Sequence, residues 1–281
     1  MNLVSARNLR ISYGNNVAVS DVSFTIRNGE ATAIIGESGS GKTTLAMALG
    51  GFLNPLHATV TADSFEFQGA DLMARESGYL PRRTPGISMI FQDAMTSLDP
   101  VWTIGQQLVA VQQQVSKVSK KSAFVIACEK LLAIGLRDPE RVMKLRPHEL
   151  SGGMRQRVMT AIALASDPAL LIADEPTSAL DASMAGEAMR LMVDSAKSKG
   201  SAVVVISHDL QLCRRYTDFV IVMYRGKIVE EIPTNQLEHA QHPYTRGLLS
   251  CVPSLETAGV ETLPLLEDFF DGRVAQEKVL A

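Results

Sequence analysis

Apolar and polar residues alternate at the start of the chain, in the pattern of strands with one buried face. Residues 3–14 read "LVSARNLRISYG" and residues 17–30 read "VAVSDVSFTIRNGE", and turn-forming glycine and asparagine residues end each run. Two such runs in succession predict an antiparallel sheet near the N-terminus. Residues 58–72 and 218–232 have a similar character, and each predicts a hairpin.

Other segments are short and almost entirely apolar, as strands buried on both faces are. They read "ATAIIG" from residue 31, "GISMIFQD" from 86, "ALLIADE" from 169 and "SAVVVISHD" from 201. The last two are separated by residues 184–200, which have helical spacing. Strands that alternate with helices predict a parallel, layered α/β core.

The helical spacing between residues 93 and 166, with few strand formers, predicts an inserted helical subdomain. We expect the main domain to span residues 1–233. Residues 234–281 form a C-terminal extension in this interpretation, with one helix near "HPYTRGLLS" and then a weakly patterned acidic tail.

The composition excludes few classes of protein, but it indicates the cellular compartment. The net charge of −3 gives no electrostatic reason to expect a nucleic-acid partner, and the three cysteines, odd in number and far apart, fit a reducing cytosolic compartment. The first residues lack the apolar stretch of a signal peptide, and no segment reaches the ~18 apolar residues needed to span a bilayer. If the protein works at a membrane, another chain has to hold it there.

The segment "GESGSGKTT", Gly36 to Thr44, follows a predicted strand and opens a predicted helix, as a phosphate-binding loop does. Its glycines leave room for backbone N–H groups to wrap phosphates, Lys42 supplies positive charge to the β- and γ-phosphates, and the Thr43 hydroxyl can bind Mg²⁺. The alternative is a chance glycine-rich turn. The predicted ATP-binding residues of this loop are Gly36, Gly39, Ser40, Gly41, Lys42, Thr43 and Thr44.

Two carboxylates follow a buried strand in "LLIADEP". Asp174 is predicted to hold Mg²⁺, and Glu175 to orient or deprotonate the attacking water. Alone, such a pair is more often a turn, but together with the phosphate loop it indicates catalysis.

Three further positions admit two interpretations each. His208 ends a strand, where it could bond the γ-phosphate or the attacking water, or be an ordinary surface residue. Gln92 could touch Mg²⁺ or its water and sense the nucleotide, or simply cap a strand end. Tyr13 could stack on adenine or be a core aromatic.

A second glycine-containing helix start occurs in "ELSGGMRQR", Glu149 to Arg157. A helix N-terminus with small residues before it is also a ready phosphate site. One chain would then carry two phosphate-binding elements, which one nucleotide bound to one chain does not explain.

In order and spacing, the phosphate loop, "FQD", "LSGGMRQR", "LIADEP", "SALD" and "SHD" together resemble the ATP-binding cassette (ABC) ATPases over residues 1 to about 232. The resemblance implies a P-loop NTPase core with a mostly parallel sheet, an N-terminal antiparallel β subdomain and an inserted helical subdomain, with ATP and Mg²⁺ as substrate and cofactor. Gln92 matches the Q-loop, Ser178 to Asp181 the D-loop, and His208 the switch histidine. Tyr13 matches the adenine-stacking aromatic. Ser151, Gly152 and Gly153 match the signature motif, which in the family touches the γ-phosphate bound to the other subunit.

The segments "MIFQDAMTSLDPVWTIGQQL", "PHELSGGMRQRVM" and "HPYTRGLL" are similar to the ATPase subunits of bacterial oligopeptide, dipeptide and nickel importers. This subgroup implies a peripheral protein at the cytoplasmic face of the inner membrane. Its partners would be a second ATPase subunit, identical or different, two transmembrane permeases and an extracytoplasmic solute-binding protein. The cargo is left open.

The sequence departs from the family pattern at Met154, where glutamine is frequent, and at Ala94, where proline is usual. Its tail has only Cys251, so we expect none of the iron–sulfur clusters found in part of the subgroup. Two other classes compete with the importer: a soluble cassette ATPase of DNA repair or ribosomes, and a regulatory nucleotide-binding module. The lack of a long coiled coil, a second cassette or a basic arm argues against the first, and the pair Asp174 and Glu175 with His208 argues against the second.

Overall fold

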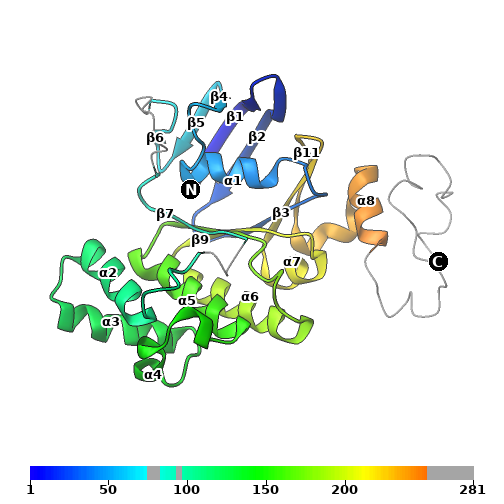
Figure 1. The fold of residues 1–281 in the computed structure, drawn as a ribbon. Helices are drawn as coiled ribbons and strands as arrows, with labels where there is room; N and C mark the ends of the chain where they lie inside the picture. The colour runs from blue at the N-terminus through cyan, green and yellow to red at the C-terminus, as the bar shows by residue number, and fades with distance from the viewer. Residues whose placement is uncertain (75–82, 93–96, 252–281) are drawn as a thin grey trace, which may run out of the picture.

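Two sheets with helices between and below them form the frame of the protein (Figure 1). The structure is a computed structural model that describes residues 1–74, 83–92 and 97–251. Ala94 and the tail from residue 252, on which two sequence interpretations rest, lie outside the described residues.

The first sheet is the predicted antiparallel one. It consists of β1 (Asn2–Tyr13), β2 (Asn16–Arg27), β4 (Ala58–Thr61), β5 (Ser64–Phe67) and β6 (Ala70–Asp71). The strand order is β2-β1-β5-β6, and β4 also pairs with β1.

The hairpin predicted over residues 58–72 forms in only part of that segment. β4 and β5 do not pair with each other; both run antiparallel to β1, end to end along its edge. β1 has 12 residues and is long enough for both. Between them the Asp63 N–H donates to the carbonyl of Arg7 at 3.0 Å, which keeps the chain on that edge. The hairpin in this region is β5–β6.

The second sheet is the α/β core. Its strands are β3 (Ala31–Ile35), β7 (Ile87–Ile90), β8 (Leu170–Asp174), β9 (Ala202–Ile206), β10 (Phe219–Tyr224) and β11 (Lys227–Pro233). The order is β11-β10-β3-β9-β8-β7, parallel except for β11, which forms the predicted hairpin with β10. Every residue of β3, β8 and β9 is buried, as their continuous apolar sequences predict.

Helices cover both faces of this core sheet (Figure 1). On one face, α1 (Lys42–Gly50) packs between the two sheets, where Leu45 and Leu49 share a core with Ile34. The other face is covered by α5 (Gly152–Ala163), α6 (Ala182–Lys197) and α7 (Leu210–Tyr216). None of the helices in the described ranges is long and apolar enough to cross a membrane.

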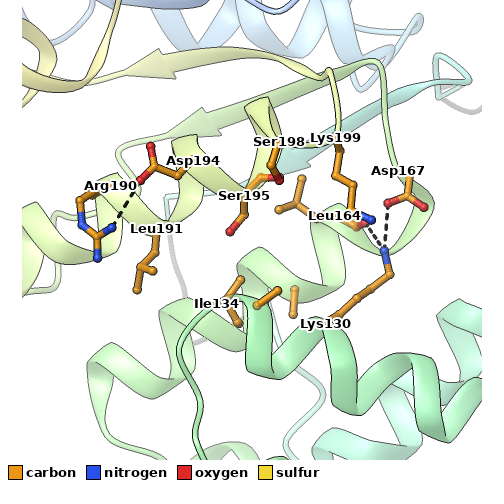
Figure 2. A pocket seen from close by; sticks show the side chains of 12 residues that line it. Lys130, Ile134, Leu164, Asp167, Arg190, Leu191, Asp194, Ser195, Ser198 and Lys199 are labelled. Carbon is orange, nitrogen blue, oxygen red and sulfur yellow. Dashed lines mark hydrogen bonds and ion pairs between the residues drawn. The ribbon is translucent and has the colours of Figure 1, made fainter.

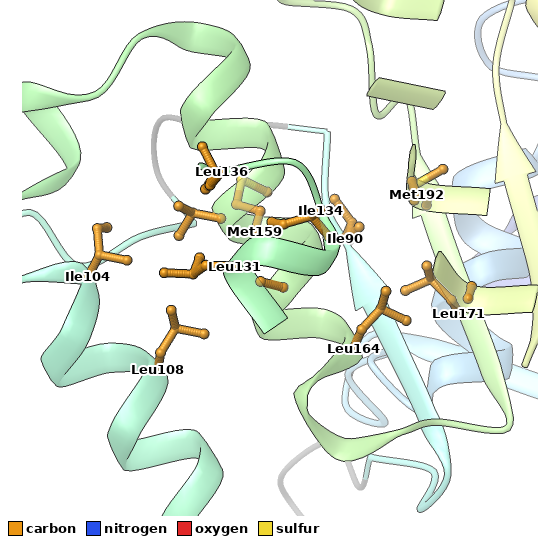
Figure 3. Packing of buried hydrophobic residues seen from close by; sticks show 14 of the residues in the cluster. Ile90, Ile104, Leu108, Leu131, Ile134, Leu136, Met159, Leu164, Leu171 and Met192 are labelled. Atoms are coloured by element: carbon orange, nitrogen blue, oxygen red, sulfur yellow. The ribbon is translucent and has the colours of Figure 1, made fainter. Parts of the chain in front are cut away.

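The inserted helical part contains α2 (Ile104–Ser116), α3 (Lys120–Ala133), α4 (Pro139–Lys144) and the 3-10 turns η1 (Pro147–Glu149) and η2 (Leu164–Ser166). The helix α2 begins at a capping box, in which Thr103 and Gln106 each accept the other's backbone N–H. Leu131 of α3 lies among Ile104 and Leu108 of α2 in a core that continues onto β8 (Figure 3). Helices therefore occupy the span predicted for the subdomain from residue 104 onward.

The described part of the chain beyond residue 233, up to residue 251, packs onto the main body. It forms η3 (Thr234–His239) and α8 (Pro243–Ser250), the helix predicted near "HPYTRGLLS". Tyr244 of α8 is fully buried in a core with Ala33 and Ile35 of β3 and Val222 of β10. The division at residue 233 stays a prediction.

Adjacent leucines of α3 test the packing of the helical part. Leu131 is 0% exposed and Leu132 is 52% exposed. We expect Leu131→Ala to lower the free energy of unfolding by about 2–5 kcal/mol, because it leaves a cavity, and Leu132→Ala by less than about 0.5 kcal/mol. Chemical denaturation measures both, and equal losses in the two variants would contradict the packing.

Candidate active site

A cavity of about 340 Å³ opens at the carboxyl ends of β3, β8 and β9. Most of its lining comes from the sequence motifs: Gly36, Ser38, Gly39, Gly41, Lys42, Thr43, Thr44, Gln92, Asp174, Glu175 and His208. The loop that joins β3 to α1 thus lies beside the ends of two neighbouring strands. This is the edge at which parallel α/β sheets bind ligands.

At two positions of the loop, close neighbours leave room for glycine only. A Cβ on Gly36 would lie 2.1 Å from the carbonyl oxygen of Met223 in β10, and one on Gly41 would lie 2.5 Å from the carbonyl of Ala18 in β2. Both residues have positive φ, of 150° and 100°. From the sequence, we expected these glycines to leave room for backbone N–H groups around phosphate. The structure adds that the loop packs closely against β2 and β10.

Lys42 is buried at the first position of α1 and is only 8% exposed. Its Nζ donates hydrogen bonds to the carbonyls of Gly36 and Glu37, each at 2.7 Å. Burial lowers the pKa of Lys42, while the nearby charges of Glu175 and Asp174 act in the opposite direction. A buried cation held by carbonyls in this way is ready to exchange them for phosphate oxygens.

Asp174, the last residue of β8, is 3% exposed. Among the described residues, its Oδ1 atom has no hydrogen-bond partner. Burial raises the pKa of this carboxyl, against a hydrogen bond from Thr43 and the charge of Lys42. A buried carboxylate oxygen with no partner, next to a threonine hydroxyl and with Gln92 on the same cavity, fits the oxygen ligands that Mg²⁺ prefers.

Glu175 leaves the strand in a left-handed conformation, with φ of 48°. Its N–H donates to the carbonyl of Ile206 at 2.9 Å, so β9 fixes the position of its backbone. Both carboxylate oxygens lie close to Nδ1 of His208, at 3.0 and 2.9 Å. A non-glycine residue in this conformation is uncommon. The arrangement holds a carboxylate on the cavity, where it can accept a proton from water.

The remaining residues that were predicted to bind the nucleotide do not all line the cavity. Ser40 is buried, and its Oγ lies 3.4 Å from Nζ of Lys42. Thr44 and Gln92 line the cavity. Tyr13, at the end of β1, is 37% exposed and is not among the lining residues, so adenine stacking by Tyr13 stays a prediction.

The signature residues are not brought to this cavity. Ser151 caps α5 by accepting the Met154 N–H at 3.3 Å, and the exposed Gly152 and half-buried Gly153 begin the first turn of that helix. Asp181 of the D-loop likewise caps α6, through hydrogen bonds from Ser183 and from the Met184 N–H that lower its pKa. The two helix starts are adjacent, since a Cβ on Gly153 would lie 3.3 Å from Sδ of Met184.

Three lining residues were missed by the sequence interpretation: Ala18, Ser38 and Ile206. Ser38 lies inside the phosphate loop, so its position was available from the motif. Ala18 comes from the other sheet, and Ile206 is an ordinary strand residue. No local signal distinguishes these two.

A second cavity of about 350 Å³ lies among α3, η2 and α6 (Figure 2). Its charged residues largely pair with one another. Lys130 bonds Asp167 at 3.0 Å, and Arg190 bonds Asp194 at 3.4 Å. None of the sequence motifs lines this cavity, and we assign it no role.

Comparison with known proteins agrees with this geometry. The ABC transporter family matches residues 19–178, from β2 through the phosphate loop and the signature helix to the D-loop. The chain belongs to the ABC transporter family. Membership confirms the family and fold resemblance, and with them the ATPase class of reaction, predicted from the sequence.

Relatives of this ABC transporter protein extend over most of its length. The dipeptide transport ATP-binding protein DppD of Bacillus subtilis is 42% identical over 271 residues, 94% of this chain and 80% of the relative. The oligopeptide transport ATP-binding protein AppD of the same species is 42% identical over 241 residues, 85% of this chain and 74% of the relative. A solved dimeric structure of the ATP-binding cassette MJ0796 bound to ADP and Pi has a TM-score of 0.67 and 28% identity, over 82% of this chain and 98% of that one.

The role of Glu175 in this ABC protein can be tested by Glu175→Gln. The amide keeps the size of the side chain but cannot take a proton, so we expect ATP turnover to fall by about 100-fold or more, with nucleotide binding nearly unchanged. Steady-state phosphate release and equilibrium nucleotide binding measure the two effects. The control is Glu187→Gln on α6, whose exposed side chain only loses an ion pair with the half-buried Arg157 and which should keep its turnover. Normal turnover in Glu175→Gln would remove Glu175 as the base.

Proposed function

We propose that the chain is the ATP-hydrolysing subunit of an importer that takes up peptides. The observation that carries this proposal is the cavity in which the phosphate loop, Asp174, Glu175 and His208 meet, in a chain 42% identical to a dipeptide transport ATP-binding protein. The soluble cassette ATPase has no comparable support, because the relatives reported above are transport proteins.

Within the cavity, each side chain has a distinct task. Lys42 turns from the carbonyls of Gly36 and Glu37 to the β- and γ-phosphates, and the loop N–H groups bind the same oxygens. Thr43, Asp174 and Gln92 would hold Mg²⁺, which when bound neutralises charge that develops on the phosphates. Glu175 accepts the proton of the attacking water, and His208 holds the Glu175 carboxylate in place.

We infer that two ATPase subunits form each complete site. In one chain, Ser151 and Gly152 are exposed, Gly153 is half-buried, and all three lie outside the cavity. A helix start with small residues suits an anion. A second subunit facing the first would place that helix start over the γ-phosphate. Identical and different partner subunits both fit this arrangement.

An importer also needs membrane proteins as partners of its ATPase subunits. We place the subunit at the cytoplasmic face of the inner membrane, bound to two permeases that receive cargo from an extracytoplasmic solute-binding protein. Exposed apolar side chains close to Gln92 in the sequence support a protein contact there: Phe91 is 40%, Val101 71% and Trp102 48% exposed. We expect no nucleic-acid partner.

Purification of the tagged chain from membranes of its source tests this function. We expect permeases to co-purify, and the reconstituted complex to accumulate labelled di- and oligopeptides in an ATP-dependent manner when the solute-binding protein is present. Uptake of nickel ions instead would correct the cargo while keeping the importer. Recovery of the chain without any membrane protein, or bound to ribosomes or DNA, would contradict the proposal.

The shared site predicts a separation of binding from turnover. Gly153→Asp places a carboxylate where the γ-phosphate of the facing subunit would bind, and a substitution there meets only the flexible Met184 side chain. We expect ATP turnover of the assembled complex to fall by about 100-fold, as when a stabilising donor is lost from a transition state. The dissociation constant of ATP for the isolated chain should not change. Weaker binding to the isolated chain would instead place Gly153 on its own nucleotide.

A further inference from the structure

One hydrogen bond connects the C-terminal helix with the phosphate loop. The backbone N–H of Glu37 donates to Oη of Tyr244 at 2.8 Å, across 207 positions of sequence. Tyr244 is 0% exposed, on the first turn of α8. A fully buried hydroxyl from the extension is therefore in direct contact with the loop that lines the nucleotide cavity.

The same peptide group is held from its other edge by the lysine of the loop. The carbonyl of Gly36 belongs to the peptide whose N–H is that of Glu37, and it accepts from Nζ of Lys42 at 2.7 Å. Because a peptide is planar, fixing the direction of its N–H also fixes the direction of its C=O. Gly36 has no side chain and φ of 150°, so its own conformational preference does little to hold the peptide.

Tyr244 is itself firmly placed. His242 caps α8 by accepting the Tyr244 N–H at 3.2 Å, and Glu230 of β11 accepts the N–H of Gln241 at 2.6 Å. The ring of Tyr224 packs on the Tyr244 ring with centroids 4.3 Å apart. Burial raises the pKa of Tyr244 to about 12, so the hydroxyl is neutral over the physiological range. The group that meets Glu37 is a rigid neutral acceptor.

We propose that Tyr244 is a positioning residue for nucleotide binding: it orients the Gly36–Glu37 peptide, and through it Lys42 and the loop, for the β- and γ-phosphates. When Lys42 leaves the Gly36 carbonyl for phosphate, the bond to Tyr244 is the contact that keeps this peptide from rotating. The helix α8 is then part of the ATPase unit. This inference rests on ATP binding at the loop, which belongs to the proposed function.

The test compares Tyr244→Phe with Thr245→Val in the full chain. Phenylalanine keeps the ring and its packing on Tyr224 but removes the acceptor of the Glu37 N–H. Thr245 is the next residue of α8, is 0% exposed, and its hydroxyl has no hydrogen-bond partner among the described residues, so valine removes a buried hydroxyl without touching the loop. We expect the dissociation constant of ATP to rise about threefold to tenfold in Tyr244→Phe, and to stay within about twofold of wild type in Thr245→Val.

Thermal unfolding and turnover complete the comparison. In the assembled complex, KM for ATP should rise in Tyr244→Phe while kcat changes less, because Glu175 and His208 are untouched. A lower melting temperature with an unchanged dissociation constant would reduce Tyr244 to a structural brace and overturn the inference. If wild type itself bound no ATP, the proposed function would fail first.

Amide hydrogen exchange gives a second measurement that does not depend on the folding of a variant. In the wild-type chain without nucleotide, the Glu37 amide should exchange slowly, because it is bonded to a fully buried hydroxyl. Rapid exchange of this amide would overturn the inference as well.

Discussion

The register of three parallel strands is the constraint on which the site depends. Ile206 of β9 pairs with Ile34 of β3 on one side and with Asp174 of β8 on the other. This register brings the phosphate loop, the two acidic residues and His208 to the same edge, although they are far apart in the sequence. A slip of one residue in either pair would turn side chains to the opposite face of the sheet. The buried strands that fix the register thus determine the geometry of the cavity, and β8 itself contributes Asp174 to its lining.

Much of the fold followed from local pattern, because each core strand is a short apolar run bounded by turn residues, and its helices have regular spacing. The hairpin predicted over residues 58–72 forms only in its second half, between β5 and β6, for a reason that the local pattern does not contain. Whether two neighbouring strands pair with each other or both with a third depends on the length of β1, not on their own residues. Contacts of this kind are tertiary.

The candidate site divides in the same way. The position of Lys42, Asp174, Glu175 and His208 on one cavity could be predicted because their motifs follow the ends of buried strands. Ala18 enters the cavity only because the two sheets pack together, and the contact of Tyr244 with Glu37 joins distant segments. The motif "HPYTRGLL" indicated a resemblance to the importer ATPases, but it predicted no role for its tyrosine.

The burial of Tyr244 against β3 and β10 also bears on where this protein ends as a working unit. A boundary at residue 233, after the last strand, separates the main domain from the segment that we predicted to be a C-terminal extension. In the folded chain, that cut would strip one wall from the core that holds Ile35 and Val222, directly beneath the first glycine of the phosphate loop. The connection between β11 and α8 is therefore a poor place for an insertion or fusion in this protein.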